Sequence, residues 1–391
     1  MKQFIFIIFI FPILTCESEK KERVAPQKVV SINPNEAKSV KRSEIFSDYF
    51  FRKLNTPDSV KFASVDELTL KNNKIFIFDR EQGLKVLVFK LNGDFLFEIN
   101  SYGRGPGEYI QPVDFVVDSE NDVLSILDTG NFKVISYDLS TGIFINEKKF
   151  DFFTEYFTKT NNGYLFFNNN FQNSTSPQNL YFTDRNLNIL DKKMPIPENK
   201  MGFHFGLIRH FGGKNETKLA LPFHNMIYSI LENDYEPYLK VDFGSKNLPD
   251  NFFDQFTSTG ERIRESRQYA NNISVFFEFE NNVFLTYKYD RKIYYYLADD
   301  ENKKSIHTNY DILQQDIELG PIYPYPKEIY ENYLVWDHQA YELKNYLRNK
   351  KEELGEAGFK EFQESNPKLM ELDQSLDEDD NPYLIFTKID F

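Results

Sequence analysis

The sequence contains very little cysteine and little histidine. Cys16 is the only cysteine among 391 residues, and five histidines are present. One thiol excludes an intrachain disulfide and any site built from several thiolates. None of the histidines belongs to a HExxH or other metal-ligand spacing. The five are His204, His210, His224, His307 and His338. We therefore expect no metal and no cofactor.

The N-terminal apolar run is too short to cross a membrane. Residues 4–14 are apolar, whereas a transmembrane helix takes ~20 such residues. Lys2 precedes the run and a charged stretch, residues 17–23, follows it. A positive start and an apolar stretch of this length are typical of a secretory signal.

Residues 13–16, Ile-Leu-Thr-Cys, resemble the lipobox of bacterial lipoproteins. In that motif the cysteine becomes the first mature residue and is acylated. The resemblance implies that residues 1–15 are a lipoprotein signal peptide. It also implies that lipid on Cys16 anchors the protein in the cell envelope, at the outer membrane, on a face that the sequence leaves open. Thr15 stands where the motif usually has Gly, Ala or Ser, and an ordinary cleaved signal or an uncleaved anchor is the alternative.

The sequence has fewer basic than acidic residues. The chain has 46 Lys and Arg against 60 Asp and Glu, a formal net charge of −14. An acidic surface repels phosphate backbones, which argues against nucleic-acid binding. Aromatic residues, in contrast, make up 17% of the chain and suit a strand-rich core. Beyond the membrane reached through the lipid, we expect a glycan, a peptide or an envelope protein as partner, and a monomeric body.

Short apolar runs begin after a polar segment. Residues 16–42 are charged and polar and include Pro26 and Pro34, so we predict a flexible tether. The later runs are β-branched or aromatic and are bounded by Asn, Gly and Asp, which is typical of strands. The clearest runs are residues 74–78, 85–89, 95–99, 115–117, 123–127, 133–137, 164–167 and 283–287.

The runs repeat along the chain. The run that ends at Asp79 matches the run that ends at Asp128, and 128 − 79 = 49. Lys85 matches Lys133 at an offset of 133 − 85 = 48. A strand-and-turn unit that recurs every ~40–50 residues indicates the blade of a β-propeller. We predict an all-β fold, a six-bladed β-propeller over residues 43–391.

Two segments depart from the strand pattern. Residues about 250–269 include a charged stretch, 260–267, that predicts a short helix or lid-like insert. Residues about 338–372 have helical spacing and predict one or two helices before the last strand. The ring must close, because an open end leaves an unpaired strand edge. We expect residues 48–54 to pair with residues 382–389.

Two motifs carry a family resemblance. Residues 102–109, Tyr-Gly-Arg-Gly-Pro-Gly-Glu-Tyr, are similar to the loop between the first two blades of the six-bladed, NHL-like β-propeller lipoproteins of Bacteroidota. Residues 379–386 are similar to that family's closing motif. The resemblance covers nearly the whole chain and implies architecture and location, with little mechanism. The residues that carry these structural motifs are Gly103, Gly105, Pro106, Gly107, Asn381 and Pro382.

The Gly-rich loop favours a structural role over a phosphate site. It lacks the lysine and serine of a Walker motif, and glycines permit positive φ in a tight turn. Arg104 and Glu108 could form an ion pair that locks neighbouring blades. Contact of Arg104, Glu108 or Tyr109 with a ligand is the alternative.

The strongest ligand candidates lie in an aromatic and basic island, residues 202–210. His204, Arg209 and His210 belong to it, and propellers bind ligands through loops at one axial face. A histidine of the core or of a blade edge is the alternative interpretation.

The aspartates at strand ends predict turn caps, because a carboxylate there can bind nearby backbone N–H groups. These are Asp79, Asp128, Asp138 and Asp184. The acidic run 377–380 predicts a solvated loop, with calcium binding as the alternative. No catalytic residue is indicated.

The sequence supports two main classes of function, besides a structural role as part of an outer-membrane assembly. The first is a lipid-anchored binding or scaffold protein of the cell envelope. The second is a metal-dependent hydrolase or lyase, which would need carboxylate, amide and imidazole groups converging on the central channel.

Overall fold

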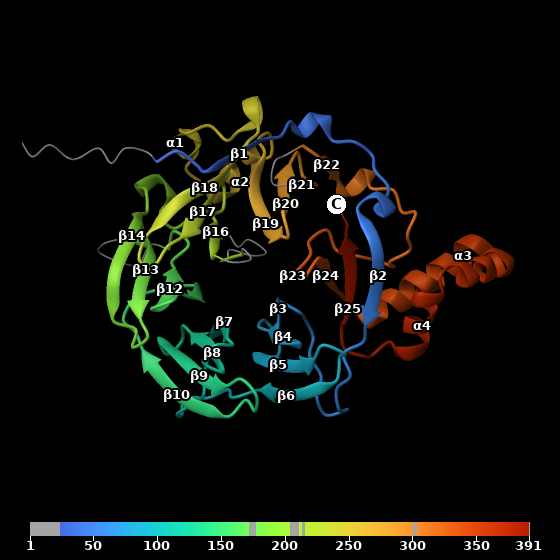
Figure 1. Ribbon diagram of the computed structural model, residues 1–391, viewed down its shortest axis with the longest axis horizontal. Coiled ribbons are helices and arrows are strands. Elements are labelled where there is room, and N and C mark those ends of the chain that lie inside the picture. The colour runs from blue at the N-terminus through green and yellow to red at the C-terminus, as the bar shows by residue number, and fades with distance from the viewer. Residues whose placement is uncertain (1–23, 172–176, 204–210, 213–215, 300–302, 391) are drawn as a thin grey trace, which may run out of the picture.

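The computed structural model describes residues 24–171, 177–203, 211–212, 216–299 and 303–390. Within these residues the chain is mostly β, and its strands form six sheets around a common centre (Figure 1). The fold is therefore propeller-like, and the predicted strand segments all lie in strands.

The first three sheets are antiparallel and follow the chain in order. Sheet 1 comprises β3 (Glu67–Lys71), β4 (Lys74–Asp79), β5 (Lys85–Lys90) and β6 (Phe95–Ile99). Sheet 2 comprises β7 (Pro112–Asp118), β8 (Val123–Asp128), β9 (Lys133–Asp138) and β10 (Phe144–Lys149). Sheet 3 comprises β11 (Tyr156–Lys159), β12 (Gly163–Phe167), β13 (Gln178–Asp184) and β14 (Ile189–Pro195).

Two of the other three sheets include a strand from the start of the chain. Sheet 4 comprises β15 (Phe211–Gly212), β16 (Lys218–Ala220), β17 (Met226–Ile230), β18 (Tyr235–Asp242) and, beside β18, β1 (Lys28–Ser31). Sheet 5 comprises β19 (Asn271–Phe279), β20 (Asn282–Tyr289), β21 (Lys292–Asp299) and β22 (Ser305–Asn309). Sheet 6 comprises β23 (Glu328–Tyr330), β24 (Tyr333–His338), β25 (Tyr383–Ile389) and β2 (Phe46–Arg52).

Local sequence sets the tight hairpins. Asn72 and Asn73 form the two-residue connection between β3 and β4, with φ of 52° and 56°. Positive φ at both central residues defines a type I′ turn, whose twist matches that of the strands and which asparagine tolerates well.

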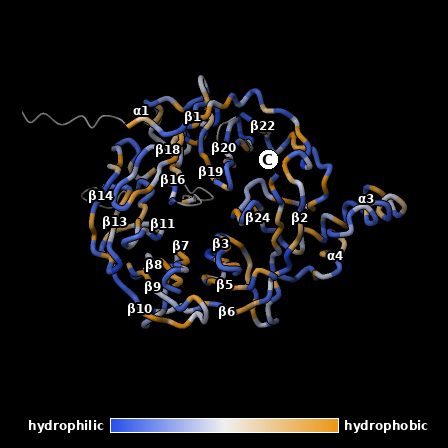
Figure 2. Tube along the Cα trace, viewed as in Figure 1, coloured by the Kyte–Doolittle hydropathy of each residue, from blue (hydrophilic) through white to orange (hydrophobic). Residues whose placement is uncertain are grey.

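The core lies between neighbouring sheets. On β4, Ile77 belongs to a buried cluster with Phe386 of β25, whereas the next residue, Phe78, belongs to a cluster with Phe115 of β7. Successive strand side chains point to opposite faces, so one strand serves two interfaces. Six such clusters link the sheets in sequence order and the last sheet to the first. Figure 2 shows apolar residues recurring along the strands around the ring.

The ring closes through the two ends of the folded body. β2 pairs antiparallel with β25, and Phe50 lies opposite Phe386. Their rings stack at 4.5 Å between centroids. The predicted pairing of residues 48–54 with 382–389 is confirmed.

The predicted tether needs a correction. β1 lies within it and pairs in parallel with the outer edge of β18, Val30 opposite Val241. Further on, the N–H of Lys38 donates to the carbonyl of His307 at 2.9 Å, and Arg42 is only 2% exposed. An uncovered strand edge offers unpaired N–H and C=O groups, and this short polar segment satisfies them. The segment from β1 to Arg42 is therefore part of the folded body.

Helices interrupt the sheets at two places. α1 (Phe252–Gln255) and α2 (Thr259–Ser266) precede β19, and α3 (Ala340–Ser365) and α4 (Pro367–Ser375) lie between β24 and β25. α3 and α4 project outward from sheet 6 (Figure 1). Short 3-10 turns occur at η1 (Pro34–Glu36), η2 (Arg42–Glu44), η3 (Glu198–Lys200), η4 (Gly244–Lys246) and η5 (Tyr310–Ile312). Within the described ranges, no helix combines the length and the apolar character needed to span a membrane.

One end of the ring carries the long connections. Because the strands of a sheet alternate in direction, the link to the next sheet emerges at the same end as the link between the second and third strands. We call this end the linker face. It carries residues 100–111, the segment after β14, the α1–α2 segment and the α3–α4 hairpin.

Candidate ligand-binding pocket

A pocket of about 120 Å³ lies at the linker face of sheets 4 and 5. Four segments distant in sequence form it: η3, the β16–β17 turn, the start of the α1–α2 segment and the first residue of β19. Its lining residues are Lys200, Phe223, His224, Asn225, Leu248, Pro249, Asp250, Phe253, Ala270 and Asn271. The pocket is a product of tertiary assembly.

Lys200 and His224 form a close pair of basic side chains. Lys200 Nζ lies 3.1 Å from His224 Nε2 and 4.9 Å from the centre of the Phe253 ring. Burial, helped by the nearby ammonium of Lys200, lowers the pKa of His224 to about 3. The imidazole is therefore neutral at pH 7, and its Nε2 accepts a hydrogen bond from the ammonium.

The charge of Lys200 is poorly compensated. Burial lowers the pKa of Lys200, and the more distant carboxylate of Asp250 opposes that shift. Among the described residues no carboxylate forms an ion pair with Lys200. The pocket thus contains a partly desolvated ammonium that holds one neutral acceptor.

An aromatic cluster supports the pocket wall. Phe203, Phe223, Phe252 and Phe253 pack together in it. Arg262 of α2 lies 5.4 Å from the ring centres of Phe203 and Phe253 and donates to backbone carbonyls of the same segment. These contacts hold α1 and α2 against the pocket, so the predicted insert at 250–269 contributes a wall.

Amide side chains fix the rest of the rim. Asn271 Nδ2 donates to the carbonyls of Ser266 (2.8 Å) and Tyr269 (2.9 Å). Asn272 Oδ1 accepts from the N–H of Phe223 at 2.8 Å. The pocket is therefore preorganised by hydrogen bonds from the first residues of β19.

The predicted basic island falls next to this pocket in sequence. Its candidates His204, Arg209 and His210 lie outside the described residues. Sequence reasoning missed the pocket pair itself. Neither Lys200 nor His224 belongs to a motif, and their separation in sequence carries no spacing signal.

The other predicted ligand candidates belong to the Gly-rich loop, and two of them bind backbone groups of the protein itself. Tyr109 is fully buried, and its hydroxyl donates to the carbonyl of Ile99 at 2.9 Å. Glu108 Oε2 accepts from the N–H of Gly105 at 2.6 Å, and no ion pair with Arg104 forms among the described residues. A ligand role for Tyr109 and the predicted ion pair are both wrong, because these side chains fold back on the loop and its neighbouring strand. Arg104 is exposed.

Close packing and backbone conformation favour glycine in the loop. A Cβ on Gly103 would lie 2.1 Å from Glu108 Oε2. Gly107 has φ of 74°, and a Cβ there would lie 2.7 Å from the Phe144 ring. Pro106, between them, is exposed. The geometry matches the predicted structural role of this turn.

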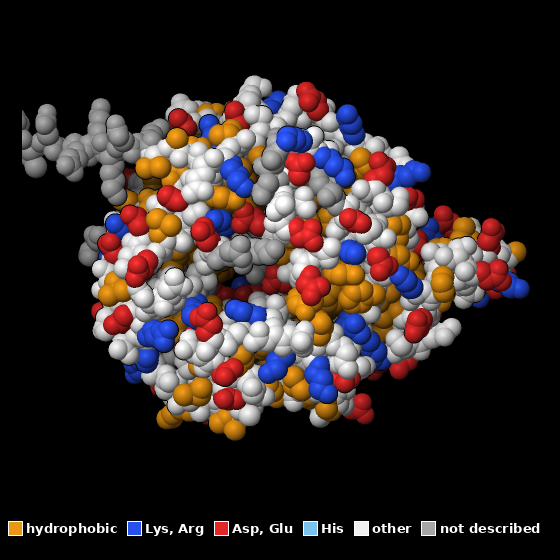
Figure 3. Space-filling model, viewed as in Figure 1, with side chains coloured by type: hydrophobic (Ala, Val, Ile, Leu, Met, Phe, Trp, Pro, Cys, Tyr) orange, Lys and Arg blue, Asp and Glu red, His pale blue; other side chains and the backbone are white. Residues whose placement is uncertain are grey.

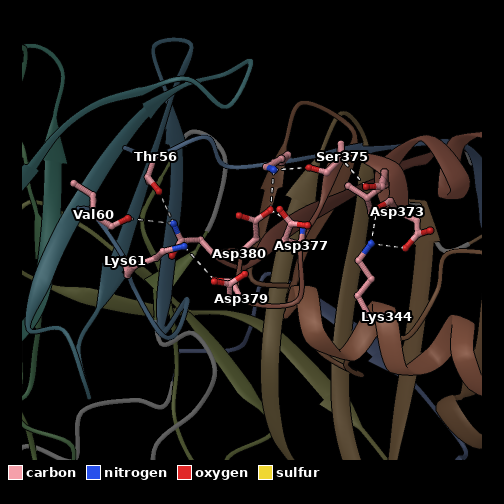
Figure 4. A network of polar contacts seen from close by, with 12 residues as sticks. Thr56, Val60, Lys61, Lys344, Asp373, Ser375, Asp377, Asp379 and Asp380 are labelled. Atoms are coloured by element: carbon pink, nitrogen blue, oxygen red, sulfur yellow. Dashed lines mark hydrogen bonds and ion pairs between the residues drawn. The ribbon is translucent and has the colours of Figure 1, made fainter. Parts of the chain in front are cut away.

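Asn381 ties the closing sheet to sheet 1. Its Oδ1 accepts from the N–H of Phe62 at 3.0 Å, and its Nδ2 donates to Thr56 Oγ1 at 2.6 Å and to the carbonyl of Val60 at 3.3 Å. Figure 4 shows Thr56 and Val60, two of these partners, beside Asp379 and Asp380 of the acidic run. The neighbouring Pro382 is buried.

The acidic run 377–380 is exposed except at its last residue, Asp380. Asp380 Oδ2 lies 2.8 Å from Lys53 Nζ and accepts from the N–H of Asp377 at 2.9 Å. Lys61 Nζ donates to the carbonyl of Asp379 at 3.1 Å (Figure 4). The run thus meets lysines and backbone N–H groups.

The strand-end aspartates cap turns as predicted. Asp79 accepts from the N–H groups of Ala63 (2.8 Å) and Gly83 (3.0 Å). Asp128 accepts from the N–H of Gln111 at 2.8 Å. Asp138 and Asp184 bind N–H groups two to four residues ahead in the same way.

The centre of the ring contains acidic groups. Figure 3 shows a hollow there, with acidic and basic side chains around it. Asp114 of β7 is buried and accepts from the N–H of Phe157 at 2.7 Å. Burial raises the pKa of Asp114, which hydrogen-bonds to Glu67 and faces Arg80. This carboxyl joins two inner strands. No group of three or more metal-ligating side chains is present in the part of the chain that the structure describes.

The comparisons with known proteins place the chain in a family. A model described as a domain of unknown function, DUF4934, matches residues 27–388. The chain belongs to the DUF4934 family. No curated protein matches the sequence.

Two solved structures are similar to this DUF4934 chain to different degrees. A Bacteroides fragilis protein described as exported is 24% identical, with a TM-score of 0.78 over 93% of this chain and 100% of the other. BamB from Moraxella catarrhalis is 10% identical, with a TM-score of 0.37 over 63% of this chain and 64% of the other. The first likeness shows a shared fold across nearly the whole chain.

Proposed function

We propose that this DUF4934 protein is a lipid-anchored binding or scaffold protein of the cell envelope. In this proposal the six sheets are the six blades of a closed β-propeller, and the α3–α4 hairpin is an insertion before the last strand. The ligand binds in the pocket around Lys200 and His224. The supporting observation is the Lys200 ammonium, which lines the pocket. Among the described residues, no carboxylate forms an ion pair with it.

The location rests on the leader and on a neighbour. Residues 1–15 have the pattern of a signal peptide, and Cys16 ends a lipobox-like motif. The similar Bacteroides fragilis protein is described as exported. Because β1 begins at Lys28, the tether between Cys16 and the folded body has 27 − 16 = 11 residues. Eleven residues reach at most about 36–40 Å even when fully extended, so the body would lie close to the membrane.

Fractionation of cells tests the location. The wild-type protein should occur in the membrane fraction with an acylated Cys16 at its N-terminus, as judged by mass spectrometry. The Cys16→Ala protein should leave that fraction. A mature wild-type protein with an unmodified residue at its N-terminus would refute the anchor.

A thermal-unfolding screen of the purified full-length protein tests the binding. The panel contains saccharides, short peptides and small acids. At least one compound should raise the Tm of the wild type and of Lys192→Met, but not that of Lys200→Met. Lys192 is the matched control, because its ammonium also lies over a ring, that of Tyr181 at 5.2 Å, outside the pocket. Equal shifts in both variants, or no shift with any compound class, would refute the proposed site.

The alternative is a metal-dependent hydrolase or lyase at the central hollow. Asp114, Glu67 and Arg80 supply charged groups of the kind that such an enzyme needs. Asp114, however, already accepts a hydrogen bond from the backbone N–H of Phe157 in β11. This alternative predicts a hydrolytic or lyase activity that a chelator abolishes. The binding proposal predicts thermal shifts that persist in the chelator.

A further inference from the structure

We infer that the pocket binds a small carboxylate that bears a hydroxyl or amino group on the adjacent carbon. The inference rests on the proposed binding function and specifies the chemistry of its ligand. Hydroxy acids and amino acids share this chemistry, whether free or as the terminal group of a larger molecule.

The carboxylate is indicated by the donors of Lys200. An ammonium has three N–H donors and no acceptor. One donor binds His224 Nε2 at 3.1 Å, and the ring of Phe253 lies 4.9 Å away on another side. Lys200 also lines the pocket, so a ligand there can accept a hydrogen bond from its ammonium. A charged donor in a partly desolvated site is best completed by an anionic acceptor.

His224 offers no free Nε2 acceptor to a cationic ligand. Its imidazole is neutral and already accepts from Lys200. The nearby Arg262 donates to the carbonyls of Phe253 and Phe256 and stabilises the wall. Lys200 is thus the cationic side chain that lines the pocket, and Asp250 is the anionic one.

The second ligand group is indicated by the rim. Asp250 lines the pocket and is exposed, and no described residue forms an ion pair or side-chain hydrogen bond with its carboxylate. Asn225 also lines the pocket, and its Nδ2 donates to Asn247 Oδ1 at 3.0 Å, which leaves its side-chain Oδ1 as an acceptor. A ligand with its carboxylate toward Lys200 can therefore donate from a hydroxyl or ammonium to Asp250 or Asn225.

Size limits the ligand. The volume of about 120 Å³ is well below the ~300–1,000 Å³ of pockets that enclose drug-sized molecules. A two- or three-carbon acid, or one terminal group of a longer chain, matches this space.

Titration with four probes tests the inference. Sodium lactate and alanine carry both groups, acetate lacks the donor, and methyl lactate lacks the carboxylate. At constant ionic strength, lactate or alanine should raise the Tm of the full-length protein, and acetate should bind at least ~10-fold more weakly. Methyl lactate should not bind. A stronger response to alanine identifies amino acids as the source of the group, and a stronger response to lactate identifies hydroxy acids.

Variants locate the binding. Lys200→Met should abolish the response, and Lys200→Arg, which keeps the charge, should retain part of it. In Asp250→Asn, the affinities for lactate and alanine should fall toward the affinity for acetate. Lys192→Met should respond to the probes as the wild type does. Binding of methyl lactate as strong as that of lactate, or an unchanged response in Lys200→Met, would overturn the inference. A neutral sugar that binds in the pocket would overturn it too and leave the proposed function intact.

Discussion

At the residue scale, a few polar side chains decide how loops are held. Asn381 makes three hydrogen bonds to the segment between β2 and β3 and is only 7% exposed. Glu108 closes its own loop through the N–H of Gly105. Lys200 and His224 differ from these, because their polar side chains contact each other and both residues line a pocket. A ligand in the pocket can reach this pair, which marks the candidate site.

Removal of the Asn381 amide should destabilise the fold. Asn381→Ala leaves the N–H of Phe62 without its acceptor in a buried place, and we expect a loss of about 2–3 kcal/mol in the free energy of unfolding. Urea titration measures the loss. Asn92→Ala, at an exposed turn asparagine, should change stability by less than ~0.5 kcal/mol. Equal effects of the two substitutions would contradict the assigned role.

Burial of neutral His224 should make the protein acid-sensitive. Its pKa is lowered from 6.5 to about 3, so the unfolded chain takes up a proton that the folded protein does not. The stabilisation is complete above pH 6.5 and is lost as pH falls toward 3. The slope for one proton is at most ~1.4 kcal/mol per pH unit. His224→Gln should reduce the slope measured by urea titration between pH 7 and pH 5.

Some of that slope should remain in His224→Gln. Burial also lowers the pKa of His307, to about 4. His307→Gln is therefore the matched control. In the double variant, the free energy of unfolding should depend less steeply on pH than in either single variant. If His224→Gln has the same slope as wild type, His224 is protonated in the folded protein.

At the element scale, strands belong to two interfaces and edges are covered. β4 contributes one face to the cluster with sheet 6 and the other to the cluster with sheet 2. β2 supplies the outer strand of sheet 6, and β1 covers the outer edge of β18. The first two strands of the chain thus pair with the outer edges of sheets formed by later strands, and they do not begin a sheet of their own.

Loss of a ring at the closure should be costly. Phe386 is completely buried, stacks on Phe50 and belongs to the cluster that joins sheet 6 to sheet 1. Phe386→Ala should lower the free energy of unfolding by about 3–5 kcal/mol. Phe132→Ala, where the side chain is 41% exposed, should cost clearly less. Chemical denaturation of both variants compares them, and a cost for Phe386→Ala as small as that for Phe132→Ala would contradict closure by this sheet.

At the scale of the whole molecule, the ring fixes which segments meet. Six interfaces in sequence order bring the linkers of successive sheets to one end. The pocket forms where two of these linkers and a hairpin turn approach one another. The N-terminal segment follows the outside of the ring from β1 to β2 (Figure 1).

Proteolysis should show where the folded body begins. Lys28 pairs with Leu239 through β1, and its ammonium lies 5.4 Å from the centre of the Tyr238 ring. Trypsin should therefore not cut the native protein after Lys28, Lys38 or Lys41, whereas the heat-denatured protein should be cut there. Mass spectrometry of the N-terminus of the resistant core gives the boundary. A core that begins after residue 42 would restore the longer tether predicted from the sequence.

The sequence by itself determined the strands, the Asp-capped turns, the leader pattern and the pairing that closes the ring. These follow from patterns that act over a few residues: alternation of apolar side chains, turn residues and a repeat near 49 residues. Tertiary structure alone decided that Tyr109 is buried, that β1 joins β18 and that Lys200 meets His224. Such contacts depend on how sheets pack around a closed ring. A lysine and a histidine in separate linkers carry no local pattern that records their approach.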